Sequence, residues 1–280
     1  MRGRGRLALP VILTMAASSP SAVTAEGIGL YLWEIGEVSV SDPSQLTDGP
    51  VTVQLDVANV QQFASFLQKY VTLEIVRADT QSITVLSKST DSIRMEPGPE
   101  ASAPSFIIDY DEPAITALLD EVDRESSAAA TPEALRKFVN EHISDKTYLR
   151  AYDIASKVAA TGSGDCTEHA FLLAALARAE GYPARVVVGV LMRATDEKVQ
   201  SFGHAWTVVH DGQAWQRFDA TLPEDPAPNE WLRYLPLMPV VNEDSGYNMG
   251  LMEKVAVWPR SVRLVPEPVR EGVGQAESLR

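Results

Sequence analysis

The sequence predicts a protein of the α+β class, in which strands and helices come in separate blocks. Residues 51–57, 71–76 and 82–86 alternate apolar and polar side chains, which is typical of half-buried strands. From Pro113 onward the apolar residues recur at helical spacing. We therefore expect a β-rich accessory region at 26–112, followed by a domain at 113–265 that contains both helices and strands.

The bulk composition is that of an ordinary soluble globular protein. The chain has 280 residues, of which 45% are hydrophobic and 22% are charged. This length suits one large domain or two modest ones. The net charge of −14 at pH 7 argues against nucleic acid or an anionic membrane surface as a partner. The sequence gives no indication of the oligomeric state.

The N-terminus has the pattern of a secretory signal. Arg2, Arg4 and Arg6 precede a short apolar stretch at 7–17, and small side chains lead up to Ala25. A stretch of this length is too short to cross a bilayer, and no other segment resembles a membrane span. We predict a signal peptide at 1–25 and an exported protein, periplasmic or secreted; a short buried helix is the alternative. The tail at 266–280, rich in Pro, Glu and Gly, is expected to be flexible.

The remaining parts of the β-rich region are less regular. Residues 106–109 have the composition of one more strand, and 61–70 fit either a short helix or a connection. Residues 96–104, rich in proline, are expected to form a loop. The region contains no histidine, cysteine or phosphate-binding loop, so its role cannot be read from the sequence.

Four helices are expected after residue 112. The first has its apolar face at 115–122, and the second starts with Thr131 as N-cap and proline at the first helical position. The third covers 152–160 and ends at the turn 161–164. The fourth begins at Cys166, after the N-cap Asp165.

Cys166 is the single cysteine, so it cannot form a disulfide within the chain. At a helix N-terminus, the peptide dipoles lower the pKa of a thiol and the free N–H groups can stabilise an oxyanion. The neighbouring Asp165 and Glu168 act in the opposite direction, because they repel a thiolate. A reactive Cys166 would therefore need a cationic partner.

A predicted hairpin supplies that partner. Residues 184–192 have the composition of a central strand, and two strand-like segments flank Asp211-Gly212, a strong signal for a two-residue loop. With that loop, His204 lies directly opposite Asp219, and opposite residues have their Cβ atoms about 5 Å apart. A carboxylate, an imidazole and a thiol in this order fit a Cys-His-Asp catalytic triad.

Four motifs resemble the transglutaminase-like domain family. They are Gly164-Asp-Cys-Thr-Glu-His-Ala170, Leu176-Ala-Arg-Ala-Glu-Gly-Tyr-Pro-Ala-Arg-Val186, Gly203-His-Ala-Trp206 and Phe218-Asp-Ala-Thr221. The resemblance covers residues 113–235 and implies a papain-like core, in which helices pack on an antiparallel sheet. It also implies that Cys166 is the nucleophile, His204 the general base and acid, and Asp219 the residue that orients His204, with no cofactor.

The family contains crosslinking enzymes, peptidases, amidases and members without known activity, so the fold does not select the reaction. We expect acyl transfer at amide bonds through a thioester, on a protein or peptide substrate in the cell envelope. The alternative is a catalytically silent peptide-binding or scaffolding module with the same fold.

Two further interpretations concern His169, which lies one helical turn beyond Cys166. It could replace His204 as the base, although packing beside the site is the simpler role. Cys166, His169, His204 and Asp219 could also be four zinc ligands, which the family resemblance opposes. Trp206 is expected to pack beside the site. The second donor to an oxyanion cannot be assigned.

Overall fold

The structure is a computed structural model that describes residues 33–38, 46, 49–122, 129–146, 153–194, 199–223, 231–241, 243–244 and 259–265. The expected signal peptide at 1–25 and the tail at 266–280 lie outside these residues. Within the described ranges, no helix is both long and apolar enough to cross a membrane.

A five-stranded antiparallel sheet carries most of the predicted site. Its order is β1-β6-β5-β8, and β7 pairs with β6. The strands are β1 (Trp33–Val38), β5 (Ala184–Ala194), β6 (Val199–His210), β7 (Trp215–Phe218) and β8 (Trp231–Pro239). The prediction that 184–192 form a central strand is confirmed, since β5 pairs with β6 on one side and β8 on the other. A strand in this position is covered on both faces, which explains its continuous run of apolar residues.

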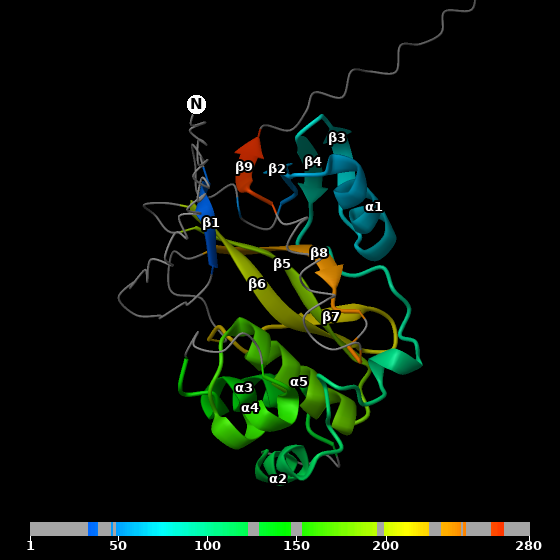
Figure 1. The fold of residues 1–280 in the computed structure, drawn as a ribbon, viewed down its shortest axis with the longest axis vertical. Coiled ribbons are helices and arrows are strands. Elements are labelled where there is room, and N and C mark those ends of the chain that lie inside the picture. Colours follow the sequence, from blue (N-terminus) through cyan, green and yellow to red (C-terminus); the bar gives the residue numbers. More distant parts are fainter. Residues whose placement is uncertain are drawn as a thin grey trace, which may run out of the picture. The chain divides into compact units, whose positions relative to one another are not determined.

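Four helices gather beside this sheet (Figure 1), and α5 packs on β5 and β6. They are α2 (Pro113–Glu121), α3 (Pro132–His142), α4 (Ala155–Thr161) and α5 (Cys166–Ala179). The cap predicted for the second helix is confirmed, because Thr131 Oγ1 accepts a hydrogen bond from the N–H of Ala134 at 3.2 Å. The predicted start of the fourth helix at Cys166 is also correct.

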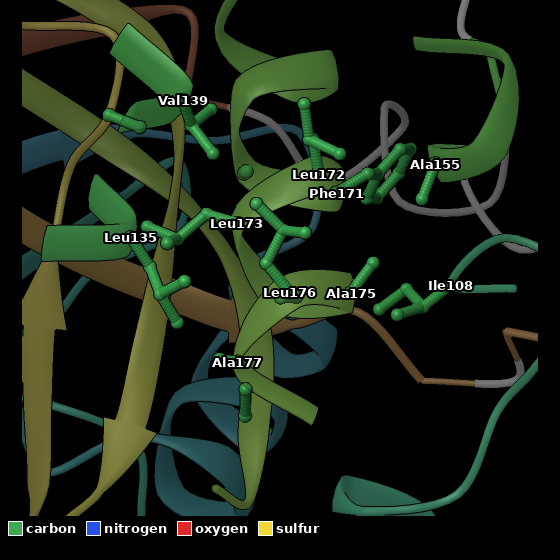
Figure 2. Close-up of a cluster of buried hydrophobic side chains, with 14 of the residues drawn as sticks. Ile108, Leu135, Val139, Ala155, Phe171, Leu172, Leu173, Ala175, Leu176 and Ala177 are labelled. Carbon is green, nitrogen blue, oxygen red and sulfur yellow. The ribbon is translucent and has the colours of Figure 1, made fainter. Parts of the chain in front are cut away.

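Helix α5 lies at the centre of the hydrophobic core. Every residue from Glu168 to Arg178 is buried, as expected for a helix surrounded by other elements. Figure 2 shows Leu172, Leu173 and Leu176 of this helix among side chains of α3, α4 and the segment before α2. The packing on all sides fixes the axis of α5, and with it the position of Cys166 at its first residue.

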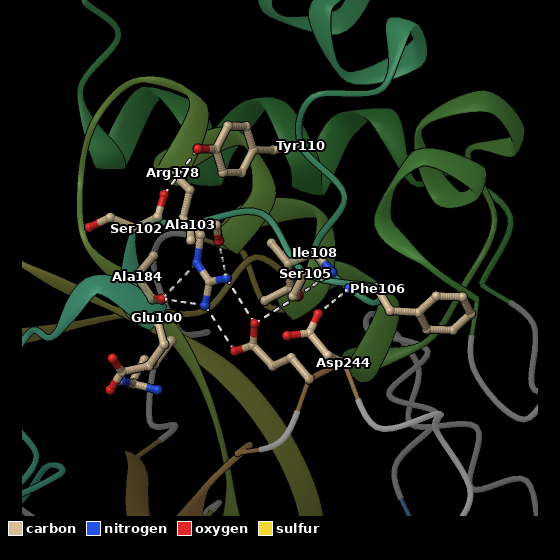
Figure 3. Close-up of polar contacts among 12 residues, drawn as sticks. Glu100, Ser102, Ala103, Ser105, Phe106, Ile108, Tyr110, Arg178, Ala184 and Asp244 are labelled. Carbon is tan, nitrogen blue, oxygen red and sulfur yellow. Dashed lines mark hydrogen bonds and ion pairs between the residues drawn. The ribbon is translucent and has the colours of Figure 1, made fainter.

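A buried ion pair fixes the other end of α5 (Figure 3). The Nη1 and Nη2 atoms of Arg178 donate to the carboxylate of Glu243 at 2.8 and 2.9 Å. Nη2 also donates to the Ala184 carbonyl at 2.9 Å, and Nη1 to the Ala103 carbonyl at 2.9 Å. Buried charges are stable only when paired and hydrogen-bonded in this way. The pair ties the C-terminal end of α5 to the start of β5.

The β-rich region forms a second, four-stranded antiparallel sheet of order β3-β4-β2-β9. The strands of this sheet are β2 (Val51–Asp56), β3 (Glu74–Ala78), β4 (Ser82–Ser87) and β9 (Ser261–Val265). The region also contains helix α1 (Val60–Tyr70) and a short 3₁₀ turn, η2 (Pro99–Ala101), in the expected loop. The segment 61–70 is therefore helical.

The strand predicted at 106–109 is wrong. Ile107 and Ile108 are buried in the core around α5, and the Ile107 carbonyl accepts a hydrogen bond from the N–H of Ala155 at the start of α4. The apolar pair thus reflects contact with helices, which an apolar run of four residues does not distinguish from a strand.

Both sheets cross the domain boundary predicted at residue 112. Strand β1 pairs with β6 of the five-stranded sheet, and β9 pairs with β2 of the four-stranded sheet. Helix α1 also packs against β8. The accessory region therefore supplies an edge strand to the sheet that holds His204.

Candidate active site

A capping box sets the orientation of Cys166 at the start of α5. The Asp165 carboxylate accepts a hydrogen bond from the N–H of Thr167 at 2.8 Å, and the Glu168 carboxylate accepts one from the N–H of Asp165 at 2.9 Å. These contacts use donors that a helix N-terminus otherwise leaves unpaired. Gly164 gives the turn room, because a Cβ there would lie 2.2 Å from the Cβ of Glu168.

Cys166 meets β6 at a gap in the edge of the sheet. Among the described residues, β1 pairs with β6 up to Gly203 and β7 pairs with it from Thr207, which leaves 204–206 without a strand partner on this edge. Helix α5, which begins at Cys166, packs on β6, and the backbone of Ala205, inside this gap, lowers the pKa of the Cys166 thiol through a hydrogen bond. The thiol is therefore close to the residue that follows His204.

The surroundings of Cys166 favour the neutral thiol. Burial raises the pKa of the Cys166 thiol well above its ordinary value, and the negative charges of Asp165 and Asp219 raise it further. Glu168 adds to this effect only once it ionises, because burial raises its own pKa to about 8. The hydrogen bond from Ala205 lowers the pKa in part. In the resting state the sulfur thus carries its proton, and a base has to remove it before the thiolate can react.

His204 is held by Asp219. The distance between His204 Nε2 and Asp219 Oδ2 is 2.7 Å, and both side chains are buried. An ionised carboxylate only accepts hydrogen bonds, so Nε2 carries the imidazole proton and Nδ1 is the basic nitrogen. Nδ1 is buried, and no group in the described ranges forms a hydrogen bond with it. It is the atom free to take a proton.

Asp219 is kept ionised by its partners. Burial alone would raise the pKa of Asp219, but the charge and hydrogen bond of His204 and the hydrogen bonds of Tyr234 and Thr221 lower it to about 2. The N–H of Thr221 donates to Oδ1 at 2.9 Å, and the Tyr234 hydroxyl donates to Oδ2 at 2.7 Å. A stable negative charge next to His204 stabilises the imidazolium that forms on proton transfer.

The predicted two-residue hairpin loop is wrong. Trp215 of β7 pairs with His210 of β6, so the loop has four residues, 211–214. The Asp211 side chain closes it by accepting two hydrogen bonds from loop N–H groups, each of 2.8 Å. Aspartate often stabilises turns through such local contacts.

The register therefore differs by two residues from the predicted one, and His204 is not directly opposite Asp219. Because side chains alternate with a period of two, this shift leaves every residue on its predicted face of the sheet. Asp219 lies just after the last residue of β7, and its side chain reaches His204 along that face. The predicted contact between the two side chains is present for this reason.

Helix α3 holds the segment that contains Asp219. Asn140 Nδ2 donates to the Ala220 carbonyl at 2.8 Å, and Arg136 Nη1 donates to the Leu222 carbonyl at 3.3 Å. These side chains fix the backbone on the C-terminal side of Asp219, where residues 219–223, the part that the structure describes, pair with no strand. The apolar face of α3, from which the sequence predicts the helix, gives no sign of this role.

The comparison with known families covers this part of the chain. Residues 116–220 match the model of the transglutaminase-like superfamily, and this range includes Cys166, His204 and Asp219. This segment is a transglutaminase-like domain. The predicted resemblance and the α+β fold class are both confirmed.

Solved structures similar to the chain share little sequence with it. A proposed cysteine protease from Cytophaga hutchinsonii is 15% identical, with a TM-score of 0.41 over 73% of this chain and 78% of that chain. The periplasmic domain of TgpA from Pseudomonas aeruginosa, bound to ethylmercury, is 17% identical, with a TM-score of 0.41 over 69% of this chain and 77% of that chain. None of the curated proteins matches the sequence.

Three aromatic rings, those of His204, Trp206 and Tyr234, pack together near Asp219 in the transglutaminase-like site. The ring centroids of Trp206 and Tyr234 each lie 6.1 Å from that of His204, and the two rings meet edge to face at 5.3 Å. The prediction that Trp206 packs beside the site is confirmed. Gly189 leaves space for Trp206, since a Cβ there would lie 2.5 Å from the end of its indole ring. A glycine inside an apolar central strand is a signal of such close approach.

His169 of the domain is buried, and its ring lies against the cap of α5. Nδ1 donates to the Asp165 carbonyl at 2.6 Å, and burial lowers the pKa of His169 to about 4, which keeps the ring neutral. The zinc interpretation finds no support: in the described part of the chain, no group of three or more His, Cys, Asp or Glu side chains could hold a metal ion.

Proposed function

We propose that the chain is a cysteine-dependent acyltransferase that acts at amide bonds, with Cys166 as nucleophile, His204 as general base and acid, and Asp219 as the residue that orients His204. One observation carries the proposal. Asp219 binds Nε2 of His204 and leaves Nδ1 as a buried, unbonded base, while Cys166 is the first residue of α5, which packs on the strand that carries His204.

The proposed reaction starts from a neutral thiol. Nδ1 of His204 takes the proton of Cys166, and the sulfur attacks the carbonyl carbon of the amide. The negative charge on the oxygen is stabilised by the backbone N–H of Cys166 at the start of α5, where the helix dipole favours an anion. The imidazolium then protonates the departing amine, and a thioester remains on Cys166.

Water or a primary amine resolves the thioester, giving hydrolysis or crosslinking. Both outcomes share every step up to this intermediate. We propose a protein or peptide substrate in the cell envelope, and a periplasmic or secreted location, on the basis of the charged and apolar pattern at residues 2–25. The proposed chemistry requires no cofactor.

A silent peptide-binding module is the second candidate. One observation favours it: the negative charge of Asp165, the residue before Cys166, opposes a thiolate. This module would keep the fold and the capping box, but Cys166 would react only as an ordinary thiol does.

The rate of alkylation of Cys166 by iodoacetamide, measured from pH 5 to pH 9, separates the two candidates. Because burial and nearby carboxylates raise the pKa of the thiol, labelling below pH 8 requires proton removal by His204. We expect such labelling in the intact protein, its loss in His204→Ala and its reduction in Asp219→Ala. His210→Ala is the matched control, since His210 lies at the end of the hairpin.

Labelling that rises only around pH 8.5, the ordinary value for a thiol, or above it, and that His204→Ala leaves unchanged, would contradict the catalytic proposal and favour the binding module. If labelling depends on His204, incubation with a glutamine peptide and a primary amine then distinguishes hydrolysis from crosslinking. Mass spectrometry of the peptide reports a gain of the amine in the second case only.

A further inference from the structure

Tyr234 and His204 bind the same oxygen atom. The hydroxyl of Tyr234 and Nε2 of His204 each lie 2.7 Å from Asp219 Oδ2, whereas Oδ1 accepts the N–H of Thr221. The three side chains that meet at Oδ2 are buried. Because these side chains are shielded from solvent, a hydrogen bond from one donor to Oδ2 strongly changes the negative charge that Oδ2 offers to the other donor.

The position of Tyr234 is fixed independently of this hydrogen bond. Tyr234 belongs to β8, and its ring meets the Trp206 ring at 5.3 Å. The guanidinium of Arg217 lies 4.0 Å from the centre of the same ring, an arrangement typical of a cation–π contact. Burial and the charge of Asp219 raise the pKa of the Tyr234 hydroxyl well above its ordinary value. The hydroxyl therefore keeps its proton and acts as a donor at any physiological pH.

We propose that Tyr234 is a positioning residue that fixes the Asp219 carboxylate and shares its charge with His204, the residue that accepts the proton of Cys166. Tyr234 acts through Asp219, because its hydroxyl donates to Asp219 Oδ2. The inference rests on the proposed function only for the role of His204; the shared oxygen atom stands without it.

The physical reason is competition for one charge. A carboxylate oxygen that already accepts a hydrogen bond from a phenol offers less negative charge to the imidazolium. Without the phenol, Asp219 would stabilise protonated His204 more strongly, and the base would be occupied by a proton over a wider pH range. Other titratable or charged groups surround this pair, and they stay unchanged in the test below: Cys166 and His169 on α5, Arg217 on β7 and Arg136 on α3.

The test is an NMR titration of the imidazoles, which needs no catalytic activity. The chain has four histidines, so the His204 signal can be assigned with single variants. In Tyr234→Phe, which keeps the ring, we expect the titration midpoint of His204 to rise by about one pH unit. Tyr110→Phe is the matched control, because the hydroxyl of Tyr110 bonds the Ser102 carbonyl instead.

The Asp219→Asn background shows whether Tyr234 acts through Asp219. The amide carries no charge to share, so adding Tyr234→Phe there should leave the His204 midpoint unchanged. A shift of the same size in both backgrounds, or no shift in folded Tyr234→Phe, would overturn the inference.

A substitution in the opposite direction covers the case in which Tyr234→Phe does not fold. Site-specific 3-fluorotyrosine at position 234 has a more acidic phenol and is a stronger donor, so the His204 midpoint should fall; an unchanged or higher midpoint overturns the inference. The cysteine labelling experiment stays separate. If the His204 midpoint shifts in Tyr234→Phe but the rate of Cys166 labelling is the same with and without His204, the role of Tyr234 is supported and the proposed function is refuted.

Discussion

The substitution Gly189→Ala tests the packing that brings Trp206 and Tyr234 to the site. Gly189 lies on β5 directly opposite His204 of β6. A Cβ at this position would lie 2.2 Å from the carbonyl oxygen of Leu235 and 2.5 Å from the indole of Trp206. Real Cβ atoms essentially never approach other atoms so closely. The first contact is with backbone, so the added methyl group can be accommodated only if β8 moves.

The cost can be estimated from this geometry. Inserting a methyl group into a packed core destabilises a protein by about 1–3 kcal/mol. Two simultaneous clashes, one of them with a neighbouring strand, place Gly189→Ala at the upper end, about 3 kcal/mol. For a domain of this size, that corresponds to a fall of roughly 6–12 °C in the melting temperature. Displacement of β8 also moves Tyr234, so Cys166 labelling should change as well.

Thermal and urea denaturation measure the stability change, with Gly49→Ala as the matched control. A Cβ at Gly49 would meet no atom within 4 Å, so this substitution should leave the melting temperature nearly unchanged. If Gly189→Ala were as stable as Gly49→Ala, the close contact between β5, β8 and the Trp206 ring would be refuted, and with it our explanation of why this strand contains a glycine.

Three other predictions concern the supports of the site. Asn140→Leu leaves the backbone after Asp219 without its main donor from α3, and should cost about 1–3 kcal/mol in urea denaturation and slow the labelling of Cys166. Glu243→Ala leaves Arg178 buried without its partner, and should cost about 3–5 kcal/mol. Glu168→Gln should remove a pH dependence of stability. Burial raises the Glu168 pKa from 4.5 to about 8, so between these pH values the folded state holds a proton that the unfolded state has lost. The stabilisation that this proton gives is complete below pH 4.5 and is lost as the pH rises through 8. Urea midpoints at pH 5 and pH 8 measure this.

Each of these has a contradicting result. Equal urea midpoints for Glu243→Ala and Asp79→Ala, which removes one partner of an exposed ion pair, would mean that the Arg178 pair does not stabilise the fold. A Glu168→Gln variant that keeps the pH slope of the intact protein would assign that slope to another group. Unchanged labelling in Asn140→Leu would show that α3 does not position Asp219.

The start of α5 can be predicted from the sequence because its determinants are local. Asp165 and Glu168 lie within four residues of each other, and the capping box they form depends only on the geometry of one helical turn. The second helix can be predicted from Thr131 for the same reason. Short-range chemistry of this kind does not depend on the rest of the fold.

The hairpin shows how a wrong register can still give a correct contact. The side chain of Asp211 accepts two hydrogen bonds within the four-residue loop, and the Asp-Gly pattern does not reveal these contacts. The face of each residue depends only on whether the shift is even or odd. A shift of one residue would have placed Asp219 away from His204.

The role of Tyr234 cannot be found from the sequence. Tyr234 reaches the site only because β8 pairs with β5, and no local sequence pattern predicts that pairing. The same applies to the polar face of α3, since a charged or amide side chain on a helix is more often solvated than bonded to a distant backbone carbonyl. Gly189 is the visible signal of close packing in β5, because it interrupts an otherwise apolar strand, but the sequence does not say which ring fills the space.

Each of the two sheets pairs strands that lie far apart in the sequence, and this affects how the chain folds. Thr52 of β2 faces Val265 of β9, about 210 positions further along the chain, and Trp33 of β1 faces Gly203 of β6. Contacts of such high sequence separation require large loops to close before they contribute stability, and they slow folding. Neither sheet can be completed on the ribosome until most of the chain has been synthesised. We expect native structure to form mainly after translation, in a single late step that closes both sheets.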